Sequence, residues 1–211
     1  MIFSLSLTCG CSAPNPAVDR LWPPLVVIWG RAVWPLDFTI VLAARPAPPS
    51  LKVRLLPLGT TGEEALALGR VVDTTGYFSL SVPLPDLPAK PRTYEVQALL
   101  PSMRPLYTAL LALDNSLRRS ECNIDSDSTV LTLAARRAQS LGRSTANWHY
   151  GDLVTLPAVK IAAQELDAAI LSLAVTGEPA LDSAVATLQN SPDFLAGLAA
   201  VQEAANLSAG I

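Results

Sequence analysis

Residues 71–83 of the chain read Val71-Val72-Asp73-Thr74-Thr75-Gly76-Tyr77-Phe78-Ser79-Leu80-Ser81-Val82-Pro83. Asp73 through Gly76 carry the chemistry of a tight turn, because glycine adopts a positive φ at little cost. After the turn, Phe78, Leu80 and Val82 alternate with two serines, so these apolar side chains point to one face of a strand. The stretch therefore predicts a turn followed by a strand with one buried face.

Further strand candidates lie on both sides of this stretch. They are residues 25–34 with Gly30 as an expected bend, the Phe38, Ile40 and Leu42 set, the Leu51, Val53 and Leu55 set opposite Lys52 and Arg54, residues 66–72, and the Tyr94, Val96 and Ala98 set alternating with Glu95 and Gln97. Turn residues separate these candidates at 46–50, 59–62, 74–76 and 83–91. Short strands at such intervals are typical of a small antiparallel β-sandwich.

Proline and alanine divide the chain into two halves. Fifteen of the 18 prolines fall at or before Pro105, whereas alanines are crowded after Leu133. Proline at that density is incompatible with long helices and is tolerated at turns and strand edges. The sequence therefore predicts an α+β fold, with an N-terminal antiparallel β-sandwich at residues 21–115 and an Ala-rich helical domain at residues 126–209.

Helix signals organise the second half. They are the capping residues at 125–129 ahead of Leu131, Ala134, Ala138 and Leu141, the stop at Gly142, the run of Val159, Ala163, Leu166, Ile170 and Leu173 between Pro157 and Gly177, the short set of Leu181, Val185 and Leu188, and the start Ser191-Pro192-Asp193 ahead of Phe194, Leu198, Val201 and Ala205. Serine or aspartate at the N-cap, proline in the first turn and glycine after the last turn are typical of helix ends. Four Ala-rich helices with short links predict a close-packed bundle.

Three of the β segments together resemble a known module. Residues 51–55, 72–83 and 94–98 resemble the carboxypeptidase regulatory-like (transthyretin-like) β-sandwich, which carries a D-x-x-G-x-F-x-L-x-V-P signature followed by a Y-x-V-x-A strand. The match covers residues 36–100. The resemblance implies a non-catalytic module that serves as a spacer or a binding surface on exported proteins.

The first thirteen residues resemble the end of a bacterial lipoprotein signal peptide. An apolar run meets the small residue Gly10 and then Cys11, the expected lipid acceptor, and a Pro-rich tether completes residues 1–20. This order predicts export to the bacterial cell envelope, as an outer-membrane lipoprotein or in the periplasm, with the lipid as the only membrane contact. An ordinary apolar N-terminal strand, or a signal of another kind, stays open as the alternative.

The interpretation of the cysteines depends on that choice. If Cys11 is lipidated and Cys9 is removed, Cys122 remains as a free thiol. If nothing is cleaved, Cys122 can form a disulfide with either of the other two in an oxidising compartment. A half-buried, small apolar role for Cys122 is favoured, because no histidine or second cysteine lies near it in the sequence.

Charge and hydropathy exclude two classes of partner. The chain has 15 Lys and Arg against 18 Asp and Glu, for a formal net charge of −3, and no basic run is longer than a pair. Such a composition does not supply the positive field that nucleic-acid phosphates require. The most apolar early run, residues 25–34, is too short for a bilayer span and contains Arg31.

Residues with catalytic or metal-binding chemistry are few. His149 is the only histidine, and its flanks at 147–152 hold no nucleophile pattern, which argues against a hydrolase triad. Transthyretin-like enzymes use several histidines or His and Tyr metal ligands, so a single histidine excludes them by residue count. Asn123, Asp125 and Asp127 alternate like the start of a calcium loop, but the later residues of an EF-hand are missing. Helix capping is therefore favoured here, and a weak calcium site stays open. The sequence predicts a protein that is not an enzyme, with no cofactor and no assigned metal site.

Two functions remain after these exclusions. The favoured one is a structural or interaction scaffold with a protein partner in the cell envelope. The alternative is a carbohydrate- or small-ligand-binding module that uses Trp22, Trp29 and Trp34, or the groove between the two halves. Three exposed, coplanar indoles would favour the binding module, and a cleft with two close carboxylates would favour an enzyme.

Overall fold

The structure is a computed structural model that describes residues 23–34, 45–46, 51–60, 65–146, 148–177 and 180–208. Its strands are β1 (Leu25–Arg31), β2 (Val33–Trp34), β3 (Arg45–Pro46), β4 (Lys52–Pro57), β5 (Ala67–Val71), β6 (Tyr77–Pro83), β7 (Arg92–Leu99), β8 (Pro105–Leu113) and β9 (Arg119–Glu121). Its helices are α1 (Ser126–Ser140), α2 (Tyr150–Leu153), α3 (Pro157–Thr176), α4 (Leu181–Leu188) and α5 (Pro192–Ser208), with a short 3-10 turn at Leu84–Asp86. Strands precede helices, which confirms the α+β fold class.

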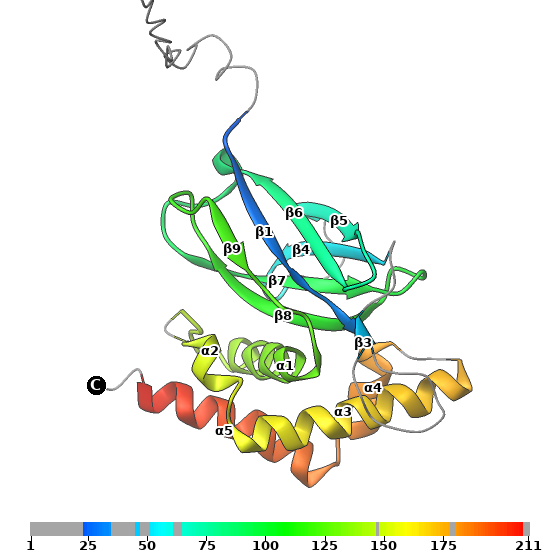
Figure 1. Cartoon of the computed structure of the whole chain (residues 1–211). Helices are drawn as coiled ribbons and strands as arrows, with labels where there is room; N and C mark the ends of the chain where they lie inside the picture. Colours follow the sequence, from blue (N-terminus) through cyan, green and yellow to red (C-terminus); the bar gives the residue numbers. More distant parts are fainter. Residues whose placement is uncertain are drawn as a thin grey trace, which may run out of the picture.

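Seven of the strands form one continuous sheet in the order β8-β7-β4-β5-β6-β1-β9. Neighbours pair antiparallel, except that β9 runs parallel to β1. The sheet curls, so that β1, β6 and β9 lie in front of β4, β7 and β8 with the helices below them (Figure 1). The strands expected to form a sandwich are therefore joined edge to edge in a single curled sheet around an enclosed core.

The turn and strand at 71–83 form as the alternation predicts. Asp73 Oδ1 accepts hydrogen bonds from the backbone N–H groups of Thr75 and Tyr77 at 2.9 and 3.1 Å, and Gly76 has a φ of +78°. Phe78, Leu80 and Val82 on β6 are all buried. Each faces a residue of β1 in an unbroken antiparallel register. This hairpin therefore contributes three side chains to the sheet's buried core.

Gly30 does not bend its strand, so that expectation is wrong. It pairs with Phe78 inside the regular β1–β6 ladder, and the strand continues to Arg31. Glycine is needed at this position because the segment after β9 lies close to it. A Cβ placed on Gly30 would lie 1.9 Å from the carbonyl oxygen of Cys122. Glycine at this position lets the backbone after β9 lie close to β1.

We expect Gly30→Ala to lower the free energy of unfolding by about 1–3 kcal/mol, because the added methyl group must displace backbone that is hydrogen-bonded to β1. The Cys122 N–H donates to the carbonyl of Trp29 at 2.9 Å, so this contact has little room to relax. Gly151→Ala in helix α2 is the control, since nothing lies within 4 Å of its added Cβ. Urea unfolding checks both variants, and an unchanged midpoint for Gly30→Ala would refute the close approach of the segment after β9.

Strand β8 was not predicted, and it changes the environment of β7. It is buried on both faces through most of its length, so its sequence is largely apolar and shows no alternation. On β7, Glu95 and Gln97 do lie opposite the apolar set, but both are buried because helix α1 covers that face. The polar face of β7 is thus an interior surface between the sheet and the helices.

The helix ends follow the predicted signals. Asp125 Oδ1 accepts a hydrogen bond from the Ser128 N–H at 2.8 Å, and Ser128 Oγ accepts one from the Asp125 N–H at 2.9 Å, which forms a capping box at the start of α1. Gly142 and Gly177 have φ values of +70° and +92° just after α1 and α3. Ser191 Oγ accepts from the Phe194 N–H at 3.2 Å at the start of α5. Helix α2 is an additional short helix in the expected polar loop.

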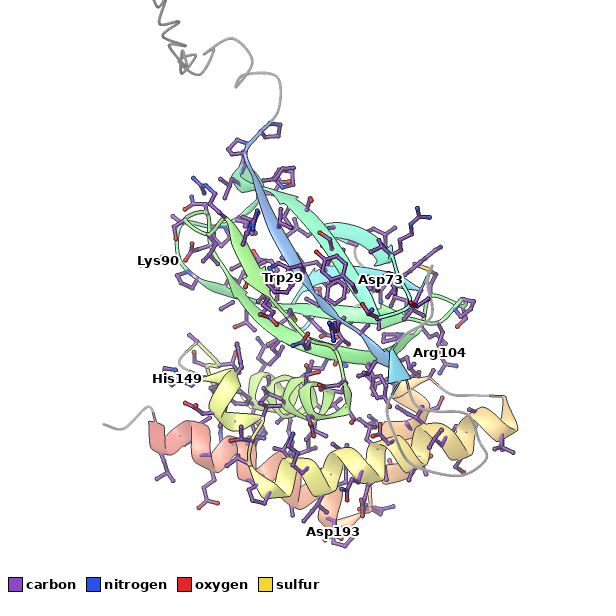
Figure 2. The ribbon with its side chains drawn as sticks, in the orientation of Figure 1. Trp29, Asp73, Lys90, Arg104, His149 and Asp193 are labelled. Carbon is purple, nitrogen blue, oxygen red and sulfur yellow. The ribbon has the colours of Figure 1, made fainter. Side chains whose placement is uncertain are left out.

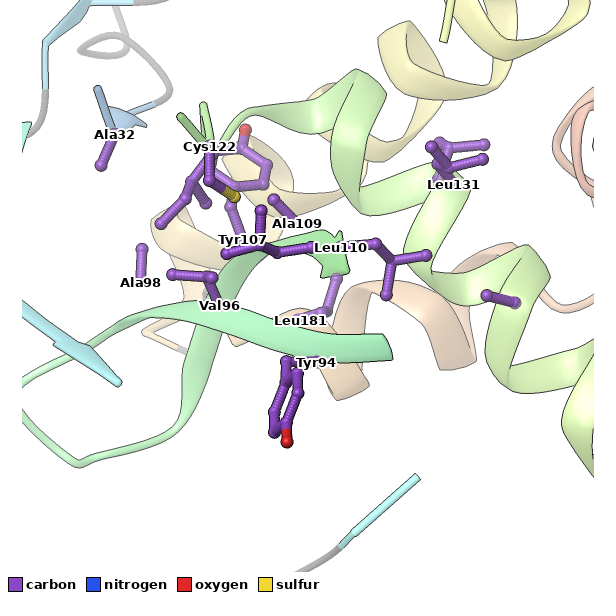
Figure 3. Close-up of a cluster of buried hydrophobic side chains, with 14 of the residues drawn as sticks. Ala32, Tyr94, Val96, Ala98, Tyr107, Ala109, Leu110, Cys122, Leu131 and Leu181 are labelled. Atoms are coloured by element: carbon purple, nitrogen blue, oxygen red, sulfur yellow. The ribbon is translucent and has the colours of Figure 1, made fainter. Parts of the chain in front are cut away.

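Sheet and helices share one hydrophobic core. Buried side chains run without a break from β1, β6 and β4, through β7 and β8, to α1, α3, α4 and α5. Figure 3 shows a part of this core, in which Leu131 of α1 and Leu181 of α4 lie on the helical side of Val96 and Ala109. Strand β9 and the buried Cys122 and Ile124 occupy the segment that was expected to link two domains. The boundaries at 115 and 126 stay a prediction.

Candidate binding groove between the sheet and the helices

A cavity of about 640 Å³ opens where the sheet meets helices α1 and α4. Its described lining comes from β4, the turn after it, β7, the start of β8, the C-terminal half of α1 and the start of α4. The lining residues are Arg54, Gly59, Thr60, Gln97, Arg104, Pro105, Arg136, Gln139, Ser140 and Asp182. This cavity, called the groove below, lies between the two halves of the chain.

The register of the sheet places the polar side chains at the base of the groove. Arg54 of β4 and Gln97 of β7 are direct cross-strand partners, so their side chains share one face. Glu95 lies two residues earlier on β7 and therefore points to the same side. Helix α1 brings Arg136 to this face from the opposite wall. Four polar residues from three elements thus converge.

These four side chains form a continuous chain of hydrogen bonds. Arg54 Nε donates to Gln97 Oε1 at 2.6 Å, and Gln97 Nε2 donates to Glu95 Oε1 at 2.5 Å. Arg136 donates through Nε to Glu95 Oε2 at 3.0 Å and through Nη2 to Glu95 Oε1. The Glu95 side chain is only 3% exposed, whereas that of Arg136 is 36% exposed. The buried carboxylate is therefore compensated, and it fixes the orientation of a partly exposed guanidinium.

A second ion pair lies at the other end of the groove. Arg104 Nη2 contacts Asp182 Oδ1 and Oδ2 at 2.8 and 2.7 Å and Ser183 Oγ at 3.0 Å. Hydrogen bonding and charge from Arg104 lower the pKa of the Asp182 carboxyl below its ordinary value. This pair is largely exposed to solvent, so it is screened and contributes little to stability. It joins the loop before β8 to helix α4.

A smaller hollow of about 270 Å³ continues from the groove along the C-terminal end of α1. Its described lining residues are Leu58, Pro91, Arg92, Thr93, Gln139, Arg143, Ser144, Thr145 and Ala146. Gln139 lines both spaces, so the two hollows adjoin. Both hollows carry several polar side chains in their lining.

The sequence-predicted site residues lie elsewhere or outside the described residues. Trp29 is half-buried on β1 and lies on the sheet, whereas Arg104 lies at the junction with the helices (Figure 2). Trp22 and Cys11 lie outside the described residues, and so does the side chain of Trp34. The proposed aromatic binding face and the lipidation site therefore stay predictions. No aromatic signal pointed to the groove, although Arg54 and Gln97 stood on a predicted outer face.

His149 is exposed just before α2, beside Trp148, which packs against the core. Within the described part of the chain, no three His, Cys, Asp or Glu side chains group closely enough to hold a metal ion. Asp125 is engaged in the capping box of α1, which supports the capping interpretation of residues 123–127. Among the described residues, no helix is both long enough and apolar enough to cross a membrane.

Two partly buried carboxylates lie close together near the start of α1. Tyr107 and Ser126 both donate hydrogen bonds to Asp167 of α3, the latter at 3.0 Å. Burial raises the pKa of Asp167 and of Asp125, and the nearby Asp127 raises both further, while hydrogen bonds act in the opposite direction. Neither residue lines the groove or the smaller hollow. Their contacts join β8, α1 and α3, which is a structural role.

Asp167→Asn is expected to flatten the pH dependence of stability. The folded protein holds a proton on Asp167 to higher pH than the unfolded chain, whose ordinary pKa is 3.8. Its favourable contribution is therefore present below pH 3.8 and is lost as pH rises through the raised pKa. Asparagine carries no charge, so the variant should match or exceed the wild type in urea at neutral pH.

The same urea series on Asp182→Asn is the control with the opposite sign. The pKa of Asp182 is lowered, so its contribution is present at neutral pH and is lost as pH falls. If Asp167→Asn loses more stability at pH 7 than at pH 4, the fold depends on ionised Asp167, and the assignment of its raised pKa is wrong.

Cys122 is buried after β9, and burial together with the charge of Asp125 raises the pKa of its thiol to about 12. A thiol in this state is a poor nucleophile, because the thiolate is the reactive form. The structure thus agrees with an apolar packing role for Cys122. Cys9 lies outside the described residues, so a disulfide between it and Cys122 stays an open alternative.

No family model matches the chain, and no curated protein matches it. Among solved structures, the chain is similar to the shaft pilin SpaA from Lactobacillus rhamnosus GG, with a TM-score of 0.27 and 12% identity over 49% of this chain and 51% of the pilin chain. A double mutant of the same pilin matches to the same extent. The chain spans about half of the pilin chain that it matches. The likeness is a coarse β-rich one, and its TM-score is too low to carry an argument about function.

Proposed function

We propose that this protein is a non-enzymatic, exported protein of the bacterial cell envelope that acts as a structural and interaction scaffold. The observation that carries the proposal is the order of its parts. The lipobox-like Cys11 and the Pro-rich tether precede β1, which begins at the end of the sheet opposite the helices (Figure 1). A lipid on Cys11 would thus hold the sheet towards the membrane and direct the helical side towards a protein partner.

The resemblance to the carboxypeptidase regulatory-like module supports the same proposal. The quoted signature residues of β6 form the centre of the core, and the module is normally non-catalytic. The described histidine is exposed and apart from the groove lining, and the close carboxylates are tied into contacts between elements. These features favour a scaffold over an enzyme.

The groove favours a second candidate function, a small-ligand- or carbohydrate-binding module. A cavity of about 640 Å³ has the size of a typical small-molecule site, and its lining contains several convergent polar side chains. The two functions are compatible, because the groove is lined by residues of β4, β7, α1 and α4, whereas β1 begins at the end of the sheet away from the helices (Figure 1). A scaffold held by its N-terminal tether would leave this groove open to solvent.

The lipid anchor is tested by replacing its acceptor. In a bacterial host that expresses the complete gene, wild type should fractionate with membranes and incorporate labelled palmitate. Cys11→Ser should lose the label and move to the soluble fraction, because two or more acyl chains are needed for stable membrane attachment. Cys9→Ser is the matched control and should keep both properties. A wild-type protein that is soluble, unlabelled and retains Met1 would refute the anchor.

The scaffold role is tested in the same cells by cross-linking before fractionation. We expect a discrete cross-linked complex with an envelope protein for wild type and Cys9→Ser, and its loss or strong reduction for Cys11→Ser. The physical reason is that membrane attachment raises the local concentration of envelope partners. If the anchored wild type forms no complex, the scaffold proposal fails even though the anchor is present.

A further inference from the structure

The groove carries a charge opposite to that of the whole chain. Among the described residues that line the groove and the smaller hollow, five are arginines and one is an acid, whereas the chain as a whole has a net charge of −3. The arginines are Arg54, Arg92, Arg104, Arg136 and Arg143, and the acid is Asp182. A concave surface lined by one sign of charge concentrates ligands of the other sign.

Two of these arginines are held in place by groups beneath them. The Nε of Arg54 is bonded to Gln97, and two nitrogens of Arg136 are bonded to the buried Glu95. Of the described residues, none accepts a hydrogen bond from the terminal nitrogens of Arg54. A guanidinium that is oriented before the ligand arrives loses less conformational entropy on binding. These side chains therefore form a prearranged set of donors rather than a random group of surface cations.

The type of donor indicates the type of ligand. The planar fork of a guanidinium matches the two oxygens of a carboxylate or a phosphate, and such paired bonds are stronger than neutral ones. Thr60, Gln139 and Ser140 add neutral hydrogen-bonding groups to the same lining. A neutral ligand would bury the arginines without an opposite charge, and an apolar ligand would bury the polar groups without hydrogen-bond partners. Both would cost binding free energy.

We propose that the groove binds an anionic ligand whose acid groups are carboxylates or phosphates. Arg54 and Arg136 receive one acid group at the base of the groove, and the smaller hollow with Arg92 and Arg143 receives a second one. This inference rests on the second candidate function, small-ligand binding in the groove, and adds the chemical class of the ligand. It does not depend on the lipid anchor or on a protein partner.

Arg104 has a separate place in this proposal. Its partner Asp182 is exposed and lines the same groove, so an incoming acid group competes with Asp182 for the guanidinium. Binding near Arg104 would then release the contact between the loop before β8 and helix α4. The ligand would thereby change a contact that joins the sheet to the helices.

The test uses calorimetric titration of the purified protein with three probes at low salt: trigalacturonic acid, inorganic pyrophosphate and neutral maltotriose. We expect one or both anions to bind and the neutral trisaccharide not to bind. Removal of a charged hydrogen-bonding group from a binding site lowers the affinity for the ligand by roughly tenfold or more. Arg54→Gln and Arg143→Gln should each reduce anion affinity by about this factor, and raising the salt concentration should weaken binding further.

Arg70→Gln is the matched control, because Arg70 is an exposed arginine of β5 that lines neither hollow. It should leave affinity unchanged, and circular dichroism of every variant confirms that the fold is kept. Arg54→Lys keeps the charge without the fork and should bind less tightly than wild type.

The three probes separate failure of the ligand class from failure of the groove. If maltotriose binds, neither anion binds, and Arg54→Gln weakens the binding of maltotriose, the ligand class is wrong while binding in the groove survives. If neither anion binds, or if Arg70→Gln weakens binding as much as Arg54→Gln, the inference is overturned. Preference for trigalacturonic acid indicates a carboxylated glycan, and preference for pyrophosphate indicates a phosphorylated ligand. Either preference supports the proposal.

Discussion

Phe78→Ala is expected to lower the free energy of unfolding by about 3–5 kcal/mol, because it removes a large buried ring and leaves a cavity. Phe78 is 0% exposed near the start of β6 and faces Gly30 of β1, which has no side chain to fill the space. Rigid hydrogen-bonded strands on both sides limit how far the core can collapse. Urea or thermal unfolding of the purified variant measures the loss.

The neighbouring serines provide the control for this prediction. Ser79 and Ser81 lie on the opposite face of β6 from Phe78, and neither is fully buried. Ser79→Ala and Ser81→Ala should therefore change stability by no more than about 0.5 kcal/mol. Losses of equal size at all three positions would contradict the register between β6 and β1.

Arg136→Met is expected to lower the free energy of unfolding by about 3–5 kcal/mol at neutral pH. The variant leaves Glu95 buried on β7 without its cation, and removal of one partner of a buried pair exposes the full desolvation penalty of the other. Urea unfolding of the purified variant at pH 7 measures the loss.

Two further variants determine how the penalty arises. Glu95→Gln combined with Arg136→Met removes both charges and should recover much of the stability lost in the single variant. Arg137→Met is the control on the same helix, because Arg137 is exposed and it is Arg136 that pairs with the buried carboxylate. If Glu95→Gln does not relieve the loss in Arg136→Met, packing of the arginine stem dominates.

Local signals predicted much of the fold, because their physics acts over a few residues. Alternation at Phe78 and Leu80, the capping box at Asp125 and the glycine after α3 each depend on immediate neighbours in the sequence. Strand β8 was missed for a physical reason as well. Buried on both faces, it has no alternation, and a short apolar run of this kind cannot be assigned to a strand or a helix from periodicity alone.

The groove was beyond the reach of the sequence for a different reason. Arg54, Gln97 and Arg136 meet only because β4 pairs with β7 in one register and α1 covers the resulting face. In the sequence, Arg54 and Gln97 are typical solvent-facing residues of amphipathic strands. A groove between the two halves was anticipated in general terms, but its arginines were not. Glu95 is the residue that could have pointed to the groove. An acid that is buried in a sheet needs a basic partner, and that partner, Arg136, lines the groove.

The position of β1 inside the sheet has a consequence for the way the chain reaches its folded state. Strand β1 pairs with β6 and β9, whose residues follow it by about fifty and about ninety positions. The close contact at Gly30 forms only when the backbone after β9 has arrived. Pairings across such distances in sequence form slowly, because closing a long loop costs conformational entropy before the stabilising contacts can form. During synthesis, the first strand therefore stays unpaired until most of the β region has left the ribosome. Delayed folding of this kind keeps the chain unfolded for longer during synthesis, which is the state that the proposed export would require.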